Sequence, residues 1–327
     1  MNKTSKTTPT SGIDKDSPCQ IVFFGTGPVA AASLRLLAED FAIEAVITKP
    51  KPPHHRGSFP VLGVADELGL PVITVTDAPD VSSKVIAAQF RSEIAVLIDF
   101  GIIVKQDVID SFPLGVINSH FSLLPQWRGA DPITFSILSG QEQTGVSLME
   151  VVEKLDEGNI VALGLFDLDG TETNASLTQD LINLSAGLLR DTLPSYIENP
   201  RAIPQEKVAD IVPEIAYPRE PSYSHKLTKQ DGFLDLSKPA EQLEREVRAY
   251  LGWPGSRTVI ADKDVVITAA HVADNTLENV DKKTIFVANK QLCLQTSSGI
   301  LVIDTLKPAG KPAMPASAFL AGYGNKI

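Results

Sequence analysis

The feature that most constrains this chain is an alternation of short apolar runs with helical stretches between residues 21 and 168. The run Ile94–Ile98 is apolar throughout, as expected for a strand that is covered on both faces. Strands that alternate with helices predict an α/β fold with a doubly wound parallel sheet. Because such a sheet binds ligands beyond the carboxyl ends of its strands, we expect functional residues directly after the apolar runs. The predicted strands are Ile21–Phe24, Ile43–Thr48, Val72–Val75, Ile94–Ile98, Val116–Asn118, Gly145–Val151 and Ile160–Leu168.

A proline-rich stretch divides the rest of the chain. Six prolines lie between Pro194 and Pro221, and because proline cannot continue a helix or a central strand, they predict an extended linker. Beyond it, an amphipathic helix is followed by five short β-rich runs with polar turns, which predicts a small β-barrel of the oligonucleotide-binding kind. The predicted divisions are a disordered tail over 1–18, a catalytic domain over 19–198, the linker over 199–222 and the barrel over 223–327.

Composition and charge exclude several classes of protein. No apolar run reaches the ~18 residues of a membrane span, and the first 18 residues lack the apolar block of a secretory signal, so we expect a cytoplasmic protein. Two distant cysteines cannot build a disulfide framework or a cysteine zinc site. The formal net charge of -11 excludes a chain-wide basic coat for nucleic acid. Residues 1–210 carry a net charge of -12 and residues 211–327 carry +1, so only the second part could tolerate a polyanion.

A glycine motif follows the first predicted strand. Gly25, Gly27 and Ala30 match the G-x-G-x-x-A pattern of dinucleotide-binding folds. A NAD site also needs an acidic residue after the second strand, where this chain reads Lys-Pro-Lys over 49–51. The pattern therefore favours a tight strand-to-helix turn over a NAD-dependent reductase.

Four of the five histidines have no metal-ligand spacing among them, so we expect no metal site. They are His54, His55, His225 and His271.

Polar residues at the end of the strand that begins at Val116 carry the strongest chemical signal. Asn118 and His120 are two positions apart, so both side chains can point to the same side of the sheet. An amide beside an imidazole can stabilise an oxyanion, because both donate hydrogen bonds where negative charge develops. Asp156 lies in a loop between two later strands, and there it could hold His120 charged or relay a proton. We expect the three side chains to converge on one solvent-accessible cleft.

These residues belong to a longer motif that resembles a known family. The motif reads Asn118-x-His120, then Ser122-Leu123-Leu124-Pro125-x-Trp127-Arg128-Gly129-x-x-Pro132, then Leu155-Asp156-x-Gly158. It strongly resembles the 10-formyltetrahydrofolate-dependent formyltransferases, and the resemblance runs from about Ile21 to the end of the chain. C-terminal features narrow it to the methionyl-tRNA formyltransferases. These features are Tyr223–Leu227, Trp253-Pro254 and Pro308–Lys311.

The resemblance implies a fold, a reaction and a set of site residues. The fold would be a Rossmann-like formyltransferase domain followed by an OB-like barrel that holds the tRNA body. The reaction would move the formyl group of 10-formyltetrahydrofolate to the amino group of methionyl-initiator tRNA, for translation initiation. The folate and the charged initiator tRNA would be the partners of a monomer, without metal or membrane. The implied residues are Asn118, His120 and Asp156 for catalysis; Ser122, Leu123, Leu124, Pro125, Phe100 and Gly101 for folate; and Lys51, Arg56 and Arg128 for tRNA.

Two other interpretations remain open on the sequence alone. A formyltransferase acting on an amino-sugar nucleotide would share the catalytic trio and the folate motif, and only the acceptor would distinguish it. A homologue that binds tRNA or folate without turnover is a second alternative. Its support is Phe121, which stands where the family usually has a very small residue. The intact trio argues against a loss of turnover.

Overall fold

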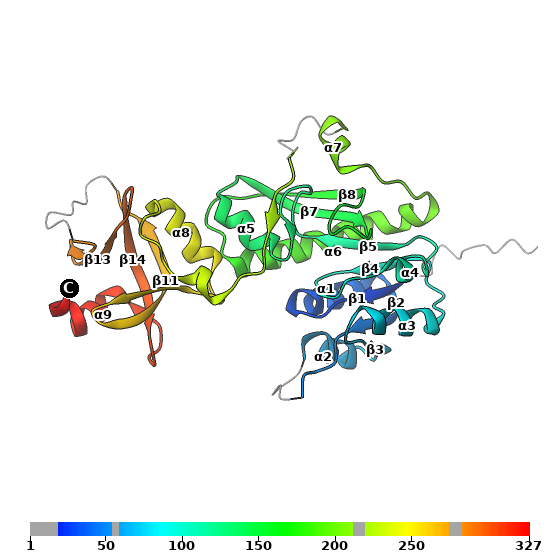
Figure 1. Ribbon diagram of the computed structural model, residues 1–327, viewed down its shortest axis with the longest axis horizontal. Coiled ribbons are helices and arrows are strands. Elements are labelled where there is room, and N and C mark those ends of the chain that lie inside the picture. Colours follow the sequence, from blue (N-terminus) through cyan, green and yellow to red (C-terminus); the bar gives the residue numbers. More distant parts are fainter. Residues whose placement is uncertain (1–18, 54–58, 212–219, 275–282) are drawn as a thin grey trace, which may run out of the picture. The chain divides into compact units, whose positions relative to one another are not determined.

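The computed structural model describes residues 19–53, 59–211, 220–274 and 283–327. These residues form two compact units. The first unit comprises Met1–Val116 and Arg190–Pro200, and the second comprises Ile117–Leu189 and Arg201–Ile327. The α/β sheet has seven strands in total, and a separate antiparallel sheet follows in the C-terminal part (Figure 1). The predicted Arg56 lies outside the described residues.

The first unit has the α/β alternation that the sequence predicts. Its strands run in the order β3-β2-β1-β4, and each of the three pairings is parallel. A proline opens α1 and another opens α2, where the missing backbone N–H costs no helical hydrogen bond. The elements are β1 (Gln20–Phe24), α1 (Pro28–Asp40), β2 (Ala42–Thr48), α2 (Pro60–Glu67), β3 (Val72–Thr74), α3 (Ala78–Ala88), β4 (Ala95–Leu97) and α4 (Gln106–Ile109).

The glycine motif forms the turn that the sequence favours. Gly27 is the N-cap of α1, and the backbone N–H groups of Thr26 and Gly27 both donate to the carbonyl of Asp99. Nearby, the Thr26 hydroxyl donates to the carbonyl of Phe100 at 2.8 Å. The turn therefore ties the end of β1 to the segment that follows β4.

The α/β part of the second unit differs from an all-parallel sheet. β7 (Gln143–Glu150) pairs antiparallel with both β5 (Val116–His120) and β8 (Ile160–Asp167). The nine residues between β7 and β8 are too few for a crossover, which needs about a dozen or more, so the two strands form a hairpin. The sheet is therefore mixed, with an antiparallel edge. The other elements here are β6 (Arg128–Gly129), α5 (Pro132–Ser139) and α6 (Asn174–Glu198).

The predicted linker over 199–222 is not extended throughout. It contains α7 (Gln205–Ile211), and Ile203 forms an isolated antiparallel bridge with Ile160 of β8. Directly after the linker, β9 (Tyr223–Ser224) pairs in parallel with β6. Pro194, the first of the six prolines, lies before the predicted linker and inside α6. Residues 201–211 of this segment therefore pack on the α/β part of the second unit.

The C-terminal part contains a six-stranded antiparallel sheet in the order β10-β11-β14-β13-β12, with β15 paired to β14. Within the described ranges its pairings do not close a ring, so the predicted barrel is a half-barrel. Leu243 and Val247 of α8, predicted to share an apolar face, are buried in its core beside Phe319 of α9. The elements are η1 (Lys229–Gly232), α8 (Ala240–Ala249), β10 (Ser256–Ile260), β11 (Lys263–Val272), β12 (Ile285–Ala288), β13 (Gln291–Gln295), β14 (Ile300–Pro308), β15 (Met314–Pro315), α9 (Ala316–Tyr323) and η2 (Gly324–Lys326).

None of the helices in the described ranges combines the length and apolarity that a membrane span requires.

Gly145 of β7 tests how closely the antiparallel edge is packed. A Cβ at this position would lie 2.0 Å from the carbonyl oxygen of Gly164 in β8 and 2.7 Å from a methyl group of Leu123. Because neither the strand nor the buried leucine can retreat freely, we expect Gly145→Ala to lower the free energy of unfolding by about 1–3 kcal/mol. Urea denaturation followed by circular dichroism measures this change.

A helical glycine supplies the control for that substitution. Gly322 lies in α9, and a Cβ there would meet no heavy atom within 4 Å. Gly322→Ala should therefore raise the unfolding free energy by up to about 1 kcal/mol, through helix propensity. Equal effects of the two substitutions would contradict the close packing of β7 against β8.

Candidate functional site

The carboxyl end of β5 holds two of the three predicted catalytic residues. Asn118 and His120 alternate with Ser119 along the strand, so their side chains leave the same face of the sheet. The side chain of His120 is 6% exposed, whereas Asn118 is partly exposed. In the part of the chain that the structure describes, no protein group hydrogen-bonds the Asn118 side-chain amide. Its N–H donors are therefore available to a ligand.

The loop after β5 is fixed by a buried hydroxyl of the next strand. Ser147, opposite His120 on β7, donates to the carbonyl of Ser122 at 2.7 Å and accepts from the N–H of Leu124 at 3.0 Å. The Ser122 hydroxyl in turn donates to the carbonyl of Gln126. These bonds set the path of the chain up to Trp127, whose carbonyl lies 3.0 Å from Nε2 of His120.

Asp156 meets His120 from the β7–β8 loop. Its Oδ1 lies 3.8 Å from Nδ1 of His120, and its Oδ2 accepts the backbone N–H of Gly129 at 2.7 Å. The Asp156 side chain is only 5% exposed. Two of the three predicted catalytic side chains therefore lie side by side in the second unit, and the third leaves the same strand as His120. Both residues of the pair are nearly buried and Asn118 is only partly exposed, so their convergence on a solvent-accessible cleft stays a prediction.

The two nitrogens of His120 have different partners. A carbonyl oxygen only accepts hydrogen bonds, so Nε2 carries a hydrogen when it contacts Trp127. Nδ1 faces the carboxylate at 3.8 Å, which is too long for a hydrogen bond but short enough for an ion pair. His120 thus directs the N–H of Nε2 at the Trp127 carbonyl, and its Nδ1 faces the carboxyl group of Asp156.

The short side chain at position 158 lets the β7–β8 loop take this path. A Cβ on Gly158 would lie 1.7 Å from the carbonyl oxygen of Glu150, at the end of β7. Backbone cannot move out of such a contact without moving the whole loop. The glycine of the Leu155-Asp156-x-Gly158 motif is therefore required by the close approach of two backbone segments, two residues from the catalytic candidate.

The predicted folate-binding signature is almost entirely buried. All four of its residues are buried, namely Ser122, Leu123, Leu124 and Pro125. Leu123 and Leu124 pack in a hydrophobic cluster that also includes residues of β7, β8 and α7. The leucine side chains hold the loop against the core of the second unit. A folate role for this segment stays a prediction, and the buried leucines would serve it by shaping the loop.

The two residues predicted to line a pterin pocket belong to the first unit. The Phe100 ring is buried and packs edge-on against Phe24 with ring centroids 5.4 Å apart. Gly101 is exposed, has a φ of 67°, and its carbonyl accepts from Nζ of Lys49 at 2.9 Å. At Phe100 the backbone is the part that could contact a ligand. The folate role of both residues stays a prediction.

The three predicted tRNA contacts stand in different surroundings. Lys51 is exposed and lines a shallow pocket with residues of α2. Arg56 lies outside the described residues. The side chain of Arg128 is only 12% exposed, and its Nη1 lies 3.3 Å from Oε1 of Glu157. Its Nη2 donates to Oε1 of Gln205 at 2.7 Å. Arg128 is thus held inside the protein beside the Asp156 loop, and its tRNA role stays a prediction.

Sequence reasoning missed Gln205 and Ser147. Gln205 is 5% exposed and donates from Nε2 to the carbonyls of Asp156 and Gly158, at 2.8 and 2.9 Å. Neither residue belongs to a recurring motif or a periodic pattern. Gln205 follows a proline within the predicted linker, and nothing in the sequence indicates its role. The carbonyls that it binds lie 47 and 49 positions away in sequence.

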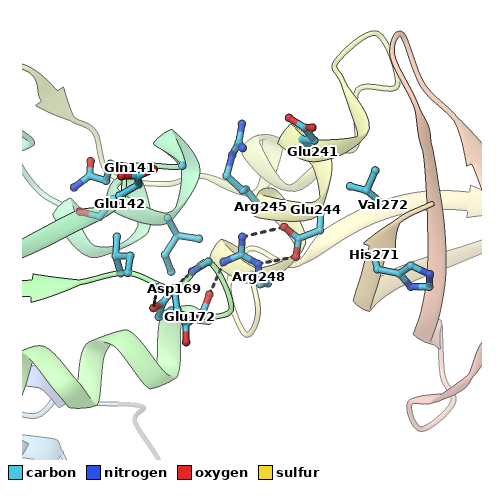
Figure 2. Close-up of a pocket in the computed structure, with 15 residues that line it drawn as sticks. Gln141, Glu142, Asp169, Glu172, Glu241, Glu244, Arg245, Arg248, His271 and Val272 are labelled. Carbon is cyan, nitrogen blue, oxygen red and sulfur yellow. Dashed lines mark hydrogen bonds and ion pairs between the residues drawn. The ribbon is translucent and has the colours of Figure 1, made fainter. Parts of the chain in front are cut away.

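A cavity in the second unit lies away from this site. It has a volume of about 680 Å³ and lies where α8 meets the end of α5 and the loop before α6 (Figure 2). Arg248 in this cavity binds Glu244 through two nitrogens and donates to the carbonyl of Glu172 at 2.8 Å. Arg245 donates to the carbonyl of Leu138. Both guanidinium groups thus join α8 to the α/β part of the unit.

The described residues contain no cluster of three or more groups that could hold a metal ion.

Family models match both parts of the chain. Residues 63–193 match the model described as formyl transferase, and residues 226–324 match the formyl transferase C-terminal domain. Proteins named methionyl-tRNA formyltransferase from Roseiflexus castenholzii and Thiobacillus denitrificans are each 33% identical to it over 309 residues. Each alignment covers 93% of this chain and 96% of the relative. The chain belongs to the formyltransferase family. It is therefore an enzyme of formyl transfer, and the family predicted from the Asn118–Gly158 motifs is confirmed.

Solved structures support the fold of this formyltransferase. HypX from Aquifex aeolicus, in complex with tetrahydrofolic acid, superposes with a TM-score of 0.60 at 16% identity, over 94% of this chain and 48% of that one. The N-formyltransferase from Helicobacter canadensis, in complex with folinic acid and dTDP-3-aminofucose, gives 0.63 at 17% identity, over 87% and 98%. At these identities the likeness establishes the α/β domain followed by a β-rich C-terminal domain.

A half-buried carboxyl two residues from Gly129 gives the formyltransferase a predictable dependence of its stability on pH. The pKa of Asp131, at the start of α5, is raised from its ordinary 3.8, mainly because burial disfavours the charged carboxylate. Hydrogen bonds from the Thr134 side chain and backbone act in the opposite direction, as does the charge of His225.

A raised pKa in the folded state fixes the sign of the Asp131 effect. The folded protein holds the proton more tightly than the unfolded chain, so this stabilisation is complete below 3.8 and is lost as the pH rises through the raised pKa. The Asp131→Asn variant has no such carboxyl to ionise, so it does not lose this stabilisation. Its unfolding free energy relative to that of the wild type should therefore increase between about pH 4.5 and about pH 8. Urea denaturation at both pH values measures the difference.

Asp169 provides a control of opposite sign. Its pKa is lowered, first by the hydrogen bond from the Thr171 side chain and then by that from the Thr171 backbone. Stability contributed by Asp169 is therefore present above its ordinary pKa and is lost as the pH falls. Both test pH values lie above that ordinary pKa, so the stability of Asp169→Asn relative to the wild type should change little between them. A difference for Asp131→Asn that does not change with pH would contradict the burial argument.

Proposed function

We propose that this formyltransferase transfers the formyl group of 10-formyltetrahydrofolate to the free amino group of methionyl-initiator tRNA, for translation initiation in the cytoplasm. The observation that carries the proposal is the full-length match to proteins named methionyl-tRNA formyltransferase, which includes the C-terminal domain. In this proposal residues 19–198 are the catalytic domain, and residues 223–327 hold the tRNA body.

The proposed reaction is an acyl transfer in which the acceptor amine attacks the formyl carbon that the folate carries on N10. The attack places negative charge on the formyl oxygen, and the partly exposed Asn118 amide is the donor best placed to receive it. His120 would provide a second donor, and for this its Nε2 exchanges the Trp127 carbonyl, now 3.0 Å away, for that oxygen. Asp156 keeps the imidazolium charged and helps move the proton of the amine toward the leaving nitrogen.

The magnitudes expected for these roles are large. One oxyanion donor typically contributes about 3 kcal/mol, so losing it should slow the reaction by about a hundredfold or more. The proposed reaction needs no covalent intermediate with the enzyme, because the acceptor amine is itself the nucleophile. Rate loss without loss of folate affinity is therefore the signature of these side chains.

Asp156→Asn tests the charge that the mechanism assigns to His120. The amide has nearly the shape of the carboxylate and can still accept the Gly129 N–H, but it carries no charge to stabilise the imidazolium. We expect kcat to fall by about a hundredfold or more, to a small residual rate, while folate binding stays within about threefold of the wild type. Asp167→Asn, at the other end of β8, is the matched control and should keep turnover. Wild-type turnover by Asp156→Asn would remove Asp156 from the mechanism.

Salt dependence distinguishes a tRNA acceptor from a sugar nucleotide. Phosphate contacts release bound counterions, so the KM for charged initiator tRNA should rise steeply with salt while the KM for folate changes little. Arg56→Ala should raise the tRNA KM without changing folate affinity. Arg35→Ala, which breaks an exposed ion pair with Glu67, is the control and should leave both constants unchanged. A soluble amino-sugar nucleotide that is formylated faster than the tRNA would contradict the proposal.

A further inference from the structure

Asp156 is held in a backbone conformation that needs external support. Its φ is 55°, in the left-handed region that side chains other than glycine rarely occupy. It lies in the nine-residue connection between β7 and β8, and its carboxylate must point inward to meet His120. A loop with these demands relaxes unless other groups fix its peptide planes.

Gln205 fixes two peptide planes of this loop, the one between Asp156 and Glu157 and the one between Gly158 and Asn159. This first residue of α7 donates from Nε2 to the carbonyl of Asp156 at 2.8 Å and to that of Gly158 at 2.9 Å. The two carbonyls flank Glu157, so the amide spans the loop at its turning point. Gln205 is itself 5% exposed, and Val208 and Ala209 of the same helix pack in the core cluster with Leu124. The helix therefore fixes the amide in place.

Arg128 determines which way the Gln205 amide points. A guanidinium only donates, so the bond of 2.7 Å from its Nη2 must be accepted by Oε1 of Gln205, which leaves the NH₂ group for the carbonyls. Arg128 also pairs with Glu157, the residue between those carbonyls. Its neighbour Gly129 donates to the carboxylate of Asp156. Arg128, Gln205 and the loop are thus connected around Asp156 by hydrogen bonds and one ion pair.

We propose that Gln205 is a positioning residue for Asp156, and that Arg128 orients Gln205 for this task. The inference rests on the proposed catalytic role of Asp156. Gln205 acts through the loop backbone and touches neither His120 nor any reacting atom. Removing its amide lets the left-handed residue relax, and the carboxylate then moves away from Nδ1 of His120.

Two substitutions of Gln205 provide the test. Gln205→Ala removes the amide, and Gln205→Glu keeps its size while replacing the donor with a carboxylate that cannot bond to the two carbonyls. We expect each to lower kcat by about tenfold to a hundredfold, because a misplacement of about 1 Å has effects of this size. The KM for folate should stay within about twofold. Gln143→Ala, which removes a side-chain amide at the opposite end of the same hairpin, is the matched control and should keep kcat.

A double-mutant cycle separates positioning from simple stabilisation. If Gln205 acts only through Asp156, Gln205→Ala should lower kcat no further in an Asp156→Asn background. Multiplied losses in the double variant, or wild-type kcat in both Gln205 variants, would overturn the inference. Wild-type kcat in Asp156→Asn alone would instead refute the proposed role of Asp156, so the two failures are distinguishable.

A spectroscopic measurement stays informative even if a variant is inactive for other reasons. The ¹⁵N chemical shifts of the His120 ring nitrogens report the charge next to Nδ1 without any substrate. We expect both Gln205 variants to shift these signals toward those of Asp156→Asn, while Gln143→Ala leaves them at the wild-type positions. Unchanged His120 signals in a folded Gln205→Glu variant would overturn the inference.

Discussion

The buried carboxylate of Asp156 is the constraint on which the arrangement of the second unit depends. A charged group that is 5% exposed is stable only when its oxygens are paired. One oxygen accepts the Gly129 N–H and the other faces His120, so two loops and the end of β5 must meet at one point. The close approach of Gly158 to Glu150 and the hydrogen bonds from Gln205 follow from that requirement.

Support for the site also comes from the end of the proline-rich segment. Ser222 receives two bonds from the loop after β5, from the N–H of Trp127 at 3.0 Å and from that of Arg128 at 2.9 Å. Its own N–H donates to the carbonyl of Pro125 at 3.2 Å. The carbonyl that His120 contacts therefore depends on a residue of the C-terminal half. Deleting that half would disturb the catalytic loop directly, so point substitutions and salt titration are the cleaner tests of acceptor binding.

The sequence predicted the parts of the structure that rest on local patterns. Alternating strands and helices located the first unit, and the rule for parallel sheets placed Asn118 and His120 at a strand end. The antiparallel edge was missed, although the short connection from Val151 to Asn159 leaves no room for a crossover. Gln205 could not be predicted, because a bond from one side chain to distant backbone carbonyls has no periodicity in sequence. Pro194 fits inside α6 because its neighbours Leu193 and Tyr196 are buried, and packing overrides local preference.

The distribution of free charge bears on how an acidic enzyme would hold a polyanion. A net charge counted along the sequence treats every lysine and arginine as available to bind phosphate. Two such residues, one near the predicted tRNA loop and one in the motif, instead bind groups of the protein itself. Lys49 donates to the carbonyl of Gly101, and Arg128 is bound by Glu157 and Gln205. If the proposed function holds, most phosphate contacts would therefore come from residues 211–327, the part with a net charge of +1. Lysines there such as Lys263, Lys307 and Lys311 are exposed. On the proposed function, these lysines should determine the slope of the salt dependence, and the Asp156 network should determine the rate.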